Sequence, residues 1–562
     1  MIEEKIKEKI REVLKNLGYK KNEEIIELAL PKLEHFGDFS TNIAFKLAKD
    51  SKESSYLIAL KIKENLPPLK YITAITVVKP GFINFCINES YYIDLLKKQI
   101  KENFLSGNKN HQKVVIEFGQ PNTHKIPHIG HLYSYIYGES LARIFEFNHN
   151  KIFRVNYQGD IGLHVAKCLY KAKQKINEMK KINNLEEKIY FLQKCYQEGS
   201  KEYEVNPKAK EEIDKLNIQI YEKDPEVFNL WAETRKWSLE FYKNFEKQLG
   251  IDYDRYYFES ETAPIGKKIV LDNLNKVFKK SQQAIIFEGK KYGLHDRVFI
   301  NKYGNPTYEA KDIGLAYLKK RDFDFDLSII TTASEQNEYW KVVIRVIELI
   351  FPELKNKIKH LGFGMVTLTT GKISSRTGNI VDPLSLIEKV KQEIKNRFAV
   401  KDEMLLNKIA FAAIKYSFLS SDYKKNIVFD LEKSIAKEGN SGPYLLYTYV
   451  RCLSVIRKAK TRKYSGEFNL PKKNGLSIDE KNLIKKITLF PKMVLQAKEN
   501  YAPNFIANYL YNLASDFNFF YQKYPILKSE EYFPLRFLIT QSVAKVLKKG
   551  LFLLGIETVE RM

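Results

Sequence analysis

Cysteine is scarce in this chain, which has four in 562 residues: Cys86, Cys168, Cys195 and Cys452. They stand far apart in the sequence, and no two of them form a Cys-x-x-Cys pair. This spacing argues against a zinc site and against a disulfide framework. Dispersed thiols of this kind are compatible with a reducing compartment, and we expect the protein to be cytoplasmic.

Long apolar segments are also lacking, because no run approaches the ~20 residues of a membrane-spanning helix. The first residues, Met-Ile-Glu-Glu-Lys-Ile, predict a charged amphipathic helix and not a signal peptide. The sequence therefore predicts no membrane span and no membrane partner.

Acidic residues are in deficit: 68 Asp and Glu stand against 93 Lys and Arg, a formal net charge of +25. A strongly basic balance favours a polyanionic partner. An alternative explanation of the same excess is a bias of the whole proteome toward Lys, since Lys, Asn and Ile are frequent throughout the chain. The hydrophobic content of 44% is sufficient for packed cores, and the length suggests several domains.

The pattern of apolar residues divides the chain into three predicted domains. Residues 1–110 combine an amphipathic helix with short strands and predict an α+β domain. Residues 111–402 contain strand, helix and strand at the spacing of a parallel βαβ unit, and predict an α/β core of the Rossmann type. Within it, residues 166–250 are charged and helical and predict an insertion between the halves of the sheet. Residues 403–562 keep helical periodicity to the end and predict an all-α domain.

Two short motifs carry the chemistry, although each is a weak signal alone. Residues 127–131 read Pro-His-Ile-Gly-His and stand between a buried strand and a predicted helix. Residues 371–376, about half the chain away, read Gly-Lys-Ile-Ser-Ser-Arg and follow the glycine-rich stretch 361–364. The order and the context of the two motifs make the pair informative.

A parallel sheet binds ligands at the carboxyl ends of its strands, where the strand order reverses. The first strand of the core ends near Glu117, so the segment from Asn122 to His131 is expected over that crevice. Gly130 permits close approach of the backbone to a nucleotide, and the helix that follows directs its positive end at phosphate. His128 and His131 are three apart and project to one side of the helix start. A metal pair or two surface histidines also fit this spacing, but no carboxylate or cysteine ligand stands nearby.

The two motifs resemble the ATP-handling signatures of class I aminoacyl-tRNA synthetases, and the residues around them resemble the arginyl-tRNA synthetases. In phosphoryl chemistry of this kind the protein mainly positions groups and stabilises charge. The resemblance implies two ATP-binding groups: His128, Gly130 and His131 in the first motif, and Lys372, Ser374 and Ser375 in the second.

The second motif departs from the class pattern Lys-Met-Ser-Lys-Ser, because Ser375 stands where the class has its second lysine. Arginyl-tRNA synthetases often lack that lysine and carry one just before the first motif. Lys125 matches this compensating position, so the departure supports the arginine family. The resemblance implies catalytic roles for Lys125, His128, His131 and Lys372.

An arginine substrate needs carboxylate partners, because paired acceptors best meet the planar fork of a guanidinium. By resemblance, the arginine site consists of Glu117, Asn122, Tyr308, Asp312 and Gln336, and Asp312 meets the guanidinium. Asp312 also fits a carboxylate at a helix N-terminus that the helix dipole stabilises.

The flanking regions resemble tRNA-binding domains of the same family. Residues 37–42 and 79–85 are similar to the extra N-terminal domain, which contacts the outer corner of the tRNA. Residues 414–419 and 439–444 are similar to the helical anticodon-binding domain. There the tRNA-binding candidates are Tyr444, Tyr447 and Arg451, since such side chains stack on splayed-out bases. The tyrosines fit packing in the helical core equally well.

The fold class expected from these observations is multidomain: an α/β Rossmann-type catalytic core, an α+β N-terminal domain and an all-α C-terminal anticodon-binding domain. The resemblance implies ATP-dependent attachment of L-arginine to tRNA(Arg) through an arginyl-adenylate, with Mg²⁺ accompanying ATP, no zinc, and a monomeric chain. The alternatives are another class I synthetase, of which the cysteinyl enzymes would need zinc ligands, and a non-catalytic RNA-binding paralogue, which would lack one of the two motifs.

Overall fold

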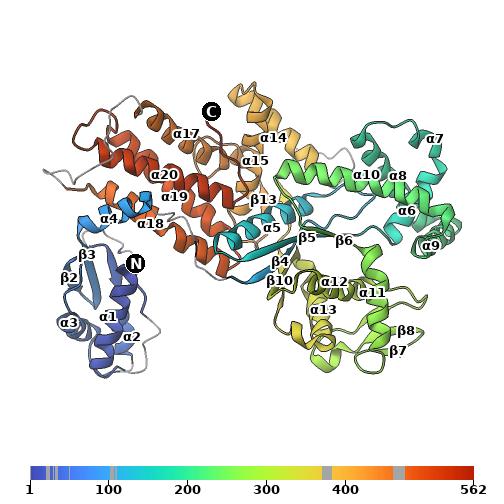
Figure 1. The fold of residues 1–562 in the computed structure, drawn as a ribbon, viewed down its shortest axis with the longest axis horizontal. Helices are drawn as coiled ribbons and strands as arrows, with labels where there is room; N and C mark the ends of the chain where they lie inside the picture. The colour runs from blue at the N-terminus through green and yellow to red at the C-terminus, as the bar shows by residue number, and fades with distance from the viewer. Residues whose placement is uncertain are drawn as a thin grey trace. The chain divides into compact units, whose positions relative to one another are not determined.

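The chain folds into two compact units (Figure 1). One comprises Met1–Phe104, Lys458–Thr488 and Phe519–Ser542, and the other comprises Leu105–Arg457, Leu489–Asn518 and Val543–Met562. The computed structural model describes residues 2–19, 26–29, 31, 36–49, 51–101, 107, 111–369, 382–459 and 475–562.

The smaller unit contains a three-stranded antiparallel sheet in the order β1-β3-β2. Helix α3 packs against β2 and β3, so the sheet buries one face under helices and forms the predicted α+β domain. The elements are α1 (Ile2–Asn16), β1 (Phe39–Thr41), α2 (Ile43–Ala48), α3 (Ser55–Asn65), β2 (Ile72–Val78), β3 (Phe82–Ile87) and α4 (Glu89–Lys101).

Asp38 joins several parts of this unit. One carboxylate oxygen accepts a hydrogen bond from the Ile87 backbone N–H at 2.6 Å, and the other accepts from the Tyr92 hydroxyl at 2.5 Å. The Lys485 ammonium lies 2.5 Å from the same side chain. Burial, followed by the hydrogen bond to Asp38, raises the pKa of Tyr92, which keeps its hydroxyl a donor. The acidic residue of the 37–42 motif therefore connects β3, α4 and α18 (Ile478–Glu499).

Replacing Asp38 with Asn is expected to loosen the smaller unit. The amide leaves Lys485 with a weaker partner and one acceptor fewer, a loss of about 2 kcal/mol. Hydrogen–deuterium exchange should rise in β3 and α4, whereas Glu4→Gln, which removes an exposed pair with Lys7, should change nothing. Unchanged exchange in β3 and α4 of the Asp38 variant would refute this role.

The larger unit is built on five parallel strands in the order β11-β10-β4-β5-β6. From β4 the chain moves outward through β5 to β6 on one side, and later through β10 to β11 on the other. The strand order therefore reverses at β4, which places a crevice at its carboxyl end. The strands are β4 (Lys113–Glu117), β5 (Lys151–Gln158), β6 (Arg255–Phe258), β10 (Leu327–Ala333) and β11 (Ile358–Phe363).

Helices connect these parallel strands, as crossover geometry requires. Strand β4 leads to β5 through the apolar helix α5 (Ile129–Phe147), of which fourteen residues are buried. Helices α11 (Glu259–Asp272) and α12 (Tyr308–Phe323) follow β6, and α13 (Asn337–Ile350) connects β10 to β11. The sequence did not predict the small antiparallel sheet between α11 and α12: β7 (Lys279–Ser281), β8 (Ala284–Phe287) and β9 (Arg297–Ile300).

The sequence segment between β5 and β6 consists of helices only. They pack around two hydrophobic clusters, one containing Ile213 and the other Leu192. Asn184, Asn206 and Asp224 cap three of the helices by accepting backbone N–H groups. The helices are α6 (Leu163–Gln174), α7 (Ile176–Met179), α8 (Leu185–Val205), α9 (Pro207–Glu222) and α10 (Pro225–Leu249).

The last part of the chain is helical, and the predicted fold class is confirmed by the combination of the three kinds of architecture. One strand interrupts the expected all-helical region, because β13 (Ile427–Phe429) pairs in parallel with β12 (Val366–Leu368). Among the described helices, none combines the length and the apolarity that a bilayer crossing requires. The remaining helices are α14 (Pro383–Phe398), α15 (Glu403–Leu419), α16 (Leu431–Ser434), α17 (Gly442–Ala459), α19 (Asn504–Lys523) and α20 (Phe533–Leu553).

Candidate active site at the carboxyl end of the sheet

The two histidines of the first motif cap the start of α5. His128 Nδ1 accepts the Gly130 backbone N–H at 3.1 Å, and His131 Nδ1 accepts the His128 backbone N–H at 3.1 Å. Their ring centroids lie 3.8 Å apart. Because each Nδ1 is an acceptor, each neutral ring carries its proton on Nε2. The pair therefore presents two Nε2–H donors at a helix N-terminus, where anions are favoured.

The surroundings of both rings favour the neutral form. Desolvation, and then the charge of Lys125, lower the pKa of His128. Desolvation, followed by His128 and Lys125, lowers the pKa of His131 well below its ordinary value. A Cβ at position 130 would lie 2.9 Å from His128 Cε1, so glycine leaves room for the closely spaced pair of rings. Within the described ranges, no cluster of three potential metal ligands occurs.

Three carboxylates lie near one another at this end of the sheet. Glu117, which is 1% exposed, binds Lys319 at 2.7 Å and accepts from the Gln120 amide at 2.6 Å. Glu259, which is 4% exposed, binds Lys311 at 2.6 Å. These two side chains are therefore already paired with buried cations.

Asp312 is the third carboxylate, and it differs from the other two. Its side chain accepts a hydrogen bond from the Tyr339 hydroxyl at 2.5 Å. No cation among the described residues lies within ion-pair distance of it. Burial raises the pKa of Asp312 well above its ordinary value, and the charges of Glu117 and Glu259 add to the rise. The site therefore holds a partly buried acidic group that has no ion-pair partner among the described residues.

The other arginine-site candidates surround this cluster to different extents. An ideal Cβ on Gly159 would lie 2.2 Å from Asn122 Oδ1 and 3.3 Å from Glu259 Oε1, so Asn122 borders the cluster. Tyr308 is the first residue of α12 and is 58% exposed, with the Lys311 ammonium 5.0 Å from its ring centroid. Gln336 is exposed at the end of a short 3₁₀ turn after β10. Among the described residues, no hydrogen bond joins Gln336 to the carboxylates.

Sequence reasoning missed Glu259, Lys311, Lys319 and Tyr339, which complete this cluster. Glu259 directly follows β6, so the rule that singled out Glu117 at the end of β4 would also have found it. The pairing of Lys319 with Glu117 spans 202 positions and left no local signal. The ATP-binding candidates Lys372, Ser374 and Ser375 lie outside the described residues.

The tRNA-binding candidates of the C-terminal region lie on α17. The Arg451 guanidinium donates to Asn518 Oδ1 at 2.6 Å and to the Tyr447 hydroxyl at 2.9 Å. Tyr447 is 38% exposed, whereas the Tyr444 ring packs against Tyr511 at 5.8 Å. Tyr447 and Arg451 thus form a hydrogen-bonded pair that Asn518 holds in place. Tyr444 contributes at least partly to packing.

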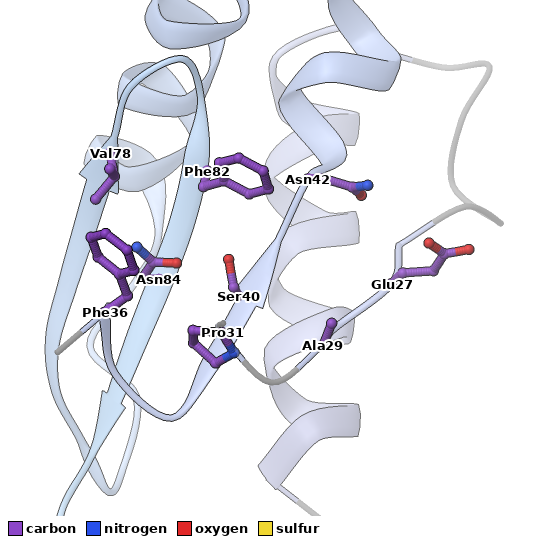
Figure 2. Close-up of a pocket in the computed structure, with 9 residues that line it drawn as sticks. All are labelled: Glu27, Ala29, Pro31, Phe36, Ser40, Asn42, Val78, Phe82 and Asn84. Atoms are coloured by element: carbon purple, nitrogen blue, oxygen red, sulfur yellow. The ribbon is translucent and has the colours of Figure 1, made fainter. Parts of the chain in front are cut away.

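The smaller unit contains a separate hollow of about 420 Å³ between β1, β3 and the segment before β1 (Figure 2). Phe82, which is 41% exposed, and the amides of Asn42 and Asn84 border it. Asn42 Oδ1 is buried with no hydrogen-bond partner among the described residues. The lining residues are Glu27, Ala29, Pro31, Phe36, Ser40, Asn42, Val78, Phe82 and Asn84.

Three family models match consecutive parts of the chain. Residues 4–87 match the arginyl tRNA synthetase N-terminal domain, and residues 94–431 match the catalytic domain of tRNA synthetases class I (R). Residues 445–562 match the DALR anticodon binding domain. Together these matches extend over nearly the whole chain.

Whole proteins of this family are similar to the chain along its length. The arginine–tRNA ligase of Bacteroides thetaiotaomicron is 30% identical, with 100% of both chains covered. That of Porphyromonas gingivalis is 30% identical, with 96% of both covered. The solved Thermus thermophilus arginyl-tRNA synthetase has the same fold, with a TM-score of 0.80 at 23% identity and 100% of both chains covered. The chain belongs to the class I arginyl-tRNA synthetase family.

Proposed function

We propose that the crevice at the carboxyl end of β4 binds the ATP and L-arginine with which this arginine–tRNA ligase charges tRNA(Arg). ATP and arginine give an enzyme-bound arginyl-adenylate and pyrophosphate. The arginyl group then passes to the 2′-hydroxyl of the 3′-terminal adenosine of the tRNA. Mg²⁺ accompanies ATP and neutralises part of the phosphate charge. The reaction and its substrates are those of the family to which the chain belongs.

The single observation that carries the arginine assignment is the unbalanced charge of Asp312. Two of the three carboxylates already have buried lysine partners, whereas Asp312 has none among the described residues. An incoming cation is therefore attracted most strongly to Asp312. A planar guanidinium supplies paired donors that match a carboxylate in geometry and in charge. Tyr339 holds the Asp312 carboxylate in place through its hydroxyl. Asn122, Tyr308 and Gln336 remain proposed contacts to the rest of the amino acid.

The proposed ATP site uses both sides of the crevice. The Nε2–H groups of His128 and His131 donate to the phosphates. Gly130, which has no side chain, allows the phosphates to approach the backbone. Lys125 brings the positive charge that stabilises the extra negative charge of the pentavalent transition state. Lys372, Ser374 and Ser375 of the second motif form the opposite side in this proposal.

Two surfaces are proposed to hold tRNA. On α17, the exposed ring of Tyr447 and the guanidinium of Arg451 offer stacking and cationic contacts to unpaired anticodon bases. In the smaller unit, the hollow beside Phe82 has an exposed aromatic ring at its edge and amides that meet the edge of a base. We infer that it receives one unstacked nucleotide.

The proposal places a monomeric enzyme in the cytoplasm. The four cysteines are free thiols, of which Cys168, Cys195 and Cys452 are buried. Persistent thiols are typical of a reducing compartment, where tRNA charging takes place.

Asp312→Asn tests the arginine assignment. Its neutral amide is expected to weaken apparent arginine affinity by about 2–5 kcal/mol, while the KM for ATP stays near that of the wild type. ATP–pyrophosphate exchange in the presence of tRNA gives both constants. The matched control is Asp324→Asn at the end of the same helix, where the side chain is 70% exposed and pairs with Lys320. An unchanged arginine KM in the Asp312 variant would leave only a helix-terminal role for this residue.

The same assignment predicts a dependence on pH. Because the pKa of Asp312 is raised, its carboxyl takes up a proton at a higher pH than an ordinary aspartate. Arginine binding favours the ionised form, so affinity should fall as the pH is lowered through that raised pKa. Asp312→Asn should show a flatter profile, and equal profiles would contradict the assignment.

Lys125→Ala tests the proposed replacement of the missing class lysine. Adenylate formation should slow by roughly 100-fold, the scale of losing one preorganised charge. Adding Ser375→Lys should recover part of this loss, because a cation returns to the same phosphates. Single-turnover adenylate formation is measured for both single variants and for the double. Lys188→Ala, which removes a lysine from the insertion helix α8, is the control. A wild-type rate for Lys125→Ala would make this residue an ordinary surface lysine.

Phe82→Ala tests the proposed base pocket. Removing one stacked base contact should weaken tRNA binding about tenfold, with little effect on the KM for arginine. Filter binding of tRNA(Arg) measures the change. Leu57→Ala is the control, since Leu57 is 52% exposed on α3 of the same unit. If both variants bind tRNA equally well, the hollow does not receive a nucleotide.

A further inference from the structure

The loop between β4 and α5, which carries Lys125, is held by the helical insertion. Tyr242 Oη lies 2.6 Å from the Asn122 carbonyl oxygen and 2.7 Å from that of Lys125. Ser238 Oγ accepts the His124 backbone N–H at 3.0 Å. These contacts come from α10 and therefore bind the loop from outside the strand and helix that it connects.

His124 is the most tightly enclosed residue of this loop. It is 0% exposed, and its backbone has a φ of +64°, a left-handed conformation that non-glycine residues rarely adopt. Its ring nitrogens lie 2.9 Å from the Thr123 hydroxyl and 2.8 Å from the Thr234 hydroxyl. Burial lowers the pKa of His124 to about 3, so the ring is neutral at physiological pH. Thr234, Ser238 and Tyr242 are four residues apart on α10 and share one helix face.

A second helix of the insertion holds the side of the loop nearest the histidine pair. Gln193 Oε1 accepts the Ile126 backbone N–H at 2.9 Å. One turn further along α8, the ring of Tyr196 lies under the Lys125 ammonium, with 4.1 Å between the nitrogen and the ring centroid. Two residues three apart on one helix face therefore contact the backbone and the cation of the loop.

An aromatic partner suits a lysine that must later meet phosphate. A carboxylate at this position would neutralise the cation and compete with the phosphates for it. A ring face attracts the cation but leaves its full charge and its N–H donors available. No carboxylate in the described part of the chain lies within ion-pair distance of Lys125. Burial raises the pKa of Tyr196, but the charge of Lys125 and a hydrogen bond with Lys125 lower it, in agreement with the proximity of the two side chains.

We propose that the helical insertion positions Lys125 for adenylate formation and that Tyr196 is the positioning residue that holds its ammonium. The inference rests on the proposed role of Lys125 in stabilising the transition state. It assigns to the insertion a task in the chemical step in addition to packing. Tyr196 acts through Lys125 and does not itself touch the reacting atoms.

Single-turnover adenylate formation in matched variants tests this proposal. Tyr196→Leu removes the ring face and should slow the step about tenfold, with the KM values for ATP and arginine changed less than about twofold. Tyr196→Phe keeps the ring and should remain near the wild-type rate. Tyr203→Leu is the control: it lies on the same helix, under Lys167 at 4.5 Å, and should not alter the rate.

The decisive measurement is the combination with Lys125→Ala. If Tyr196 acts through the ammonium, Lys125→Ala with Tyr196→Leu should be no slower than Lys125→Ala alone. Gln193→Ala provides a second route to the same loop if Tyr196→Leu does not fold, and it should show the same lack of additivity. Unfolding temperatures of all variants verify that the proteins compared are folded.

The outcomes separate this inference from the proposed function. A slow Lys125→Ala with a wild-type Tyr196→Leu overturns the positioning role and leaves the role of Lys125 intact. Fully multiplicative losses in the double variant also overturn it, because Tyr196 then acts independently of the cation. A wild-type rate for Lys125→Ala removes the premise, and the inference with it. A slow Tyr196→Phe would contradict the ring-face argument.

Discussion

The removal of charged side chains from water is the constraint on which the larger unit depends. Two lysine–carboxylate pairs are buried at the carboxyl end of the sheet, and a third carboxylate, that of Asp312, is partly buried beside them. Each unpaired charge in such surroundings carries a large desolvation cost. Asp312 has no cationic partner among the described residues, and it lies where we propose that the guanidinium of arginine binds.

Helix α12 supplies most of this arrangement, because Lys311, Asp312 and Lys319 all lie on it. The helix must therefore be placed accurately against the sheet and against its neighbour α11. Close approach of the two helices is possible because Gly314 lacks a side chain: a Cβ there would lie 2.4 Å from the Thr262 carbonyl oxygen. The proposed recognition of arginine thus depends on the packing of α12 against α11.

Helix α5 connects the catalytic crevice with the C-terminal helices of the larger unit. Its first turn carries the histidine pair, while the Ser140 hydroxyl donates to the Leu553 carbonyl at 2.9 Å and the Tyr137 hydroxyl to that of Tyr501 at 2.8 Å. The buried Lys415 ammonium donates to the carbonyls of Leu249 and Gly555, and burial lowers its pKa to about 7. The described C-terminal helices of this unit are part of the framework around the sheet.

The sequence predicted those features that depend on neighbours along the chain. The apolar run at 113–118 and the helix and strand that follow it define a βαβ unit, and the structure has β4, α5 and β5 there. Short strands such as β13 escaped prediction, since three residues give no period. The partners of Glu117 and Lys125 escaped it because they lie on other elements, far away in sequence. Motif resemblance supplied candidate residues, but not the contacts that hold them.

The contacts between the insertion and the loop limit how far this enzyme can be shortened. Residues 163–249 form a contiguous segment between two adjacent parallel strands. The sequence alone therefore suggests that a short linker could replace them. Such a deletion would remove every partner that α8 and α10 give to residues 122–126. If Lys125 acts as proposed, a minimal catalytic fragment has to retain this segment.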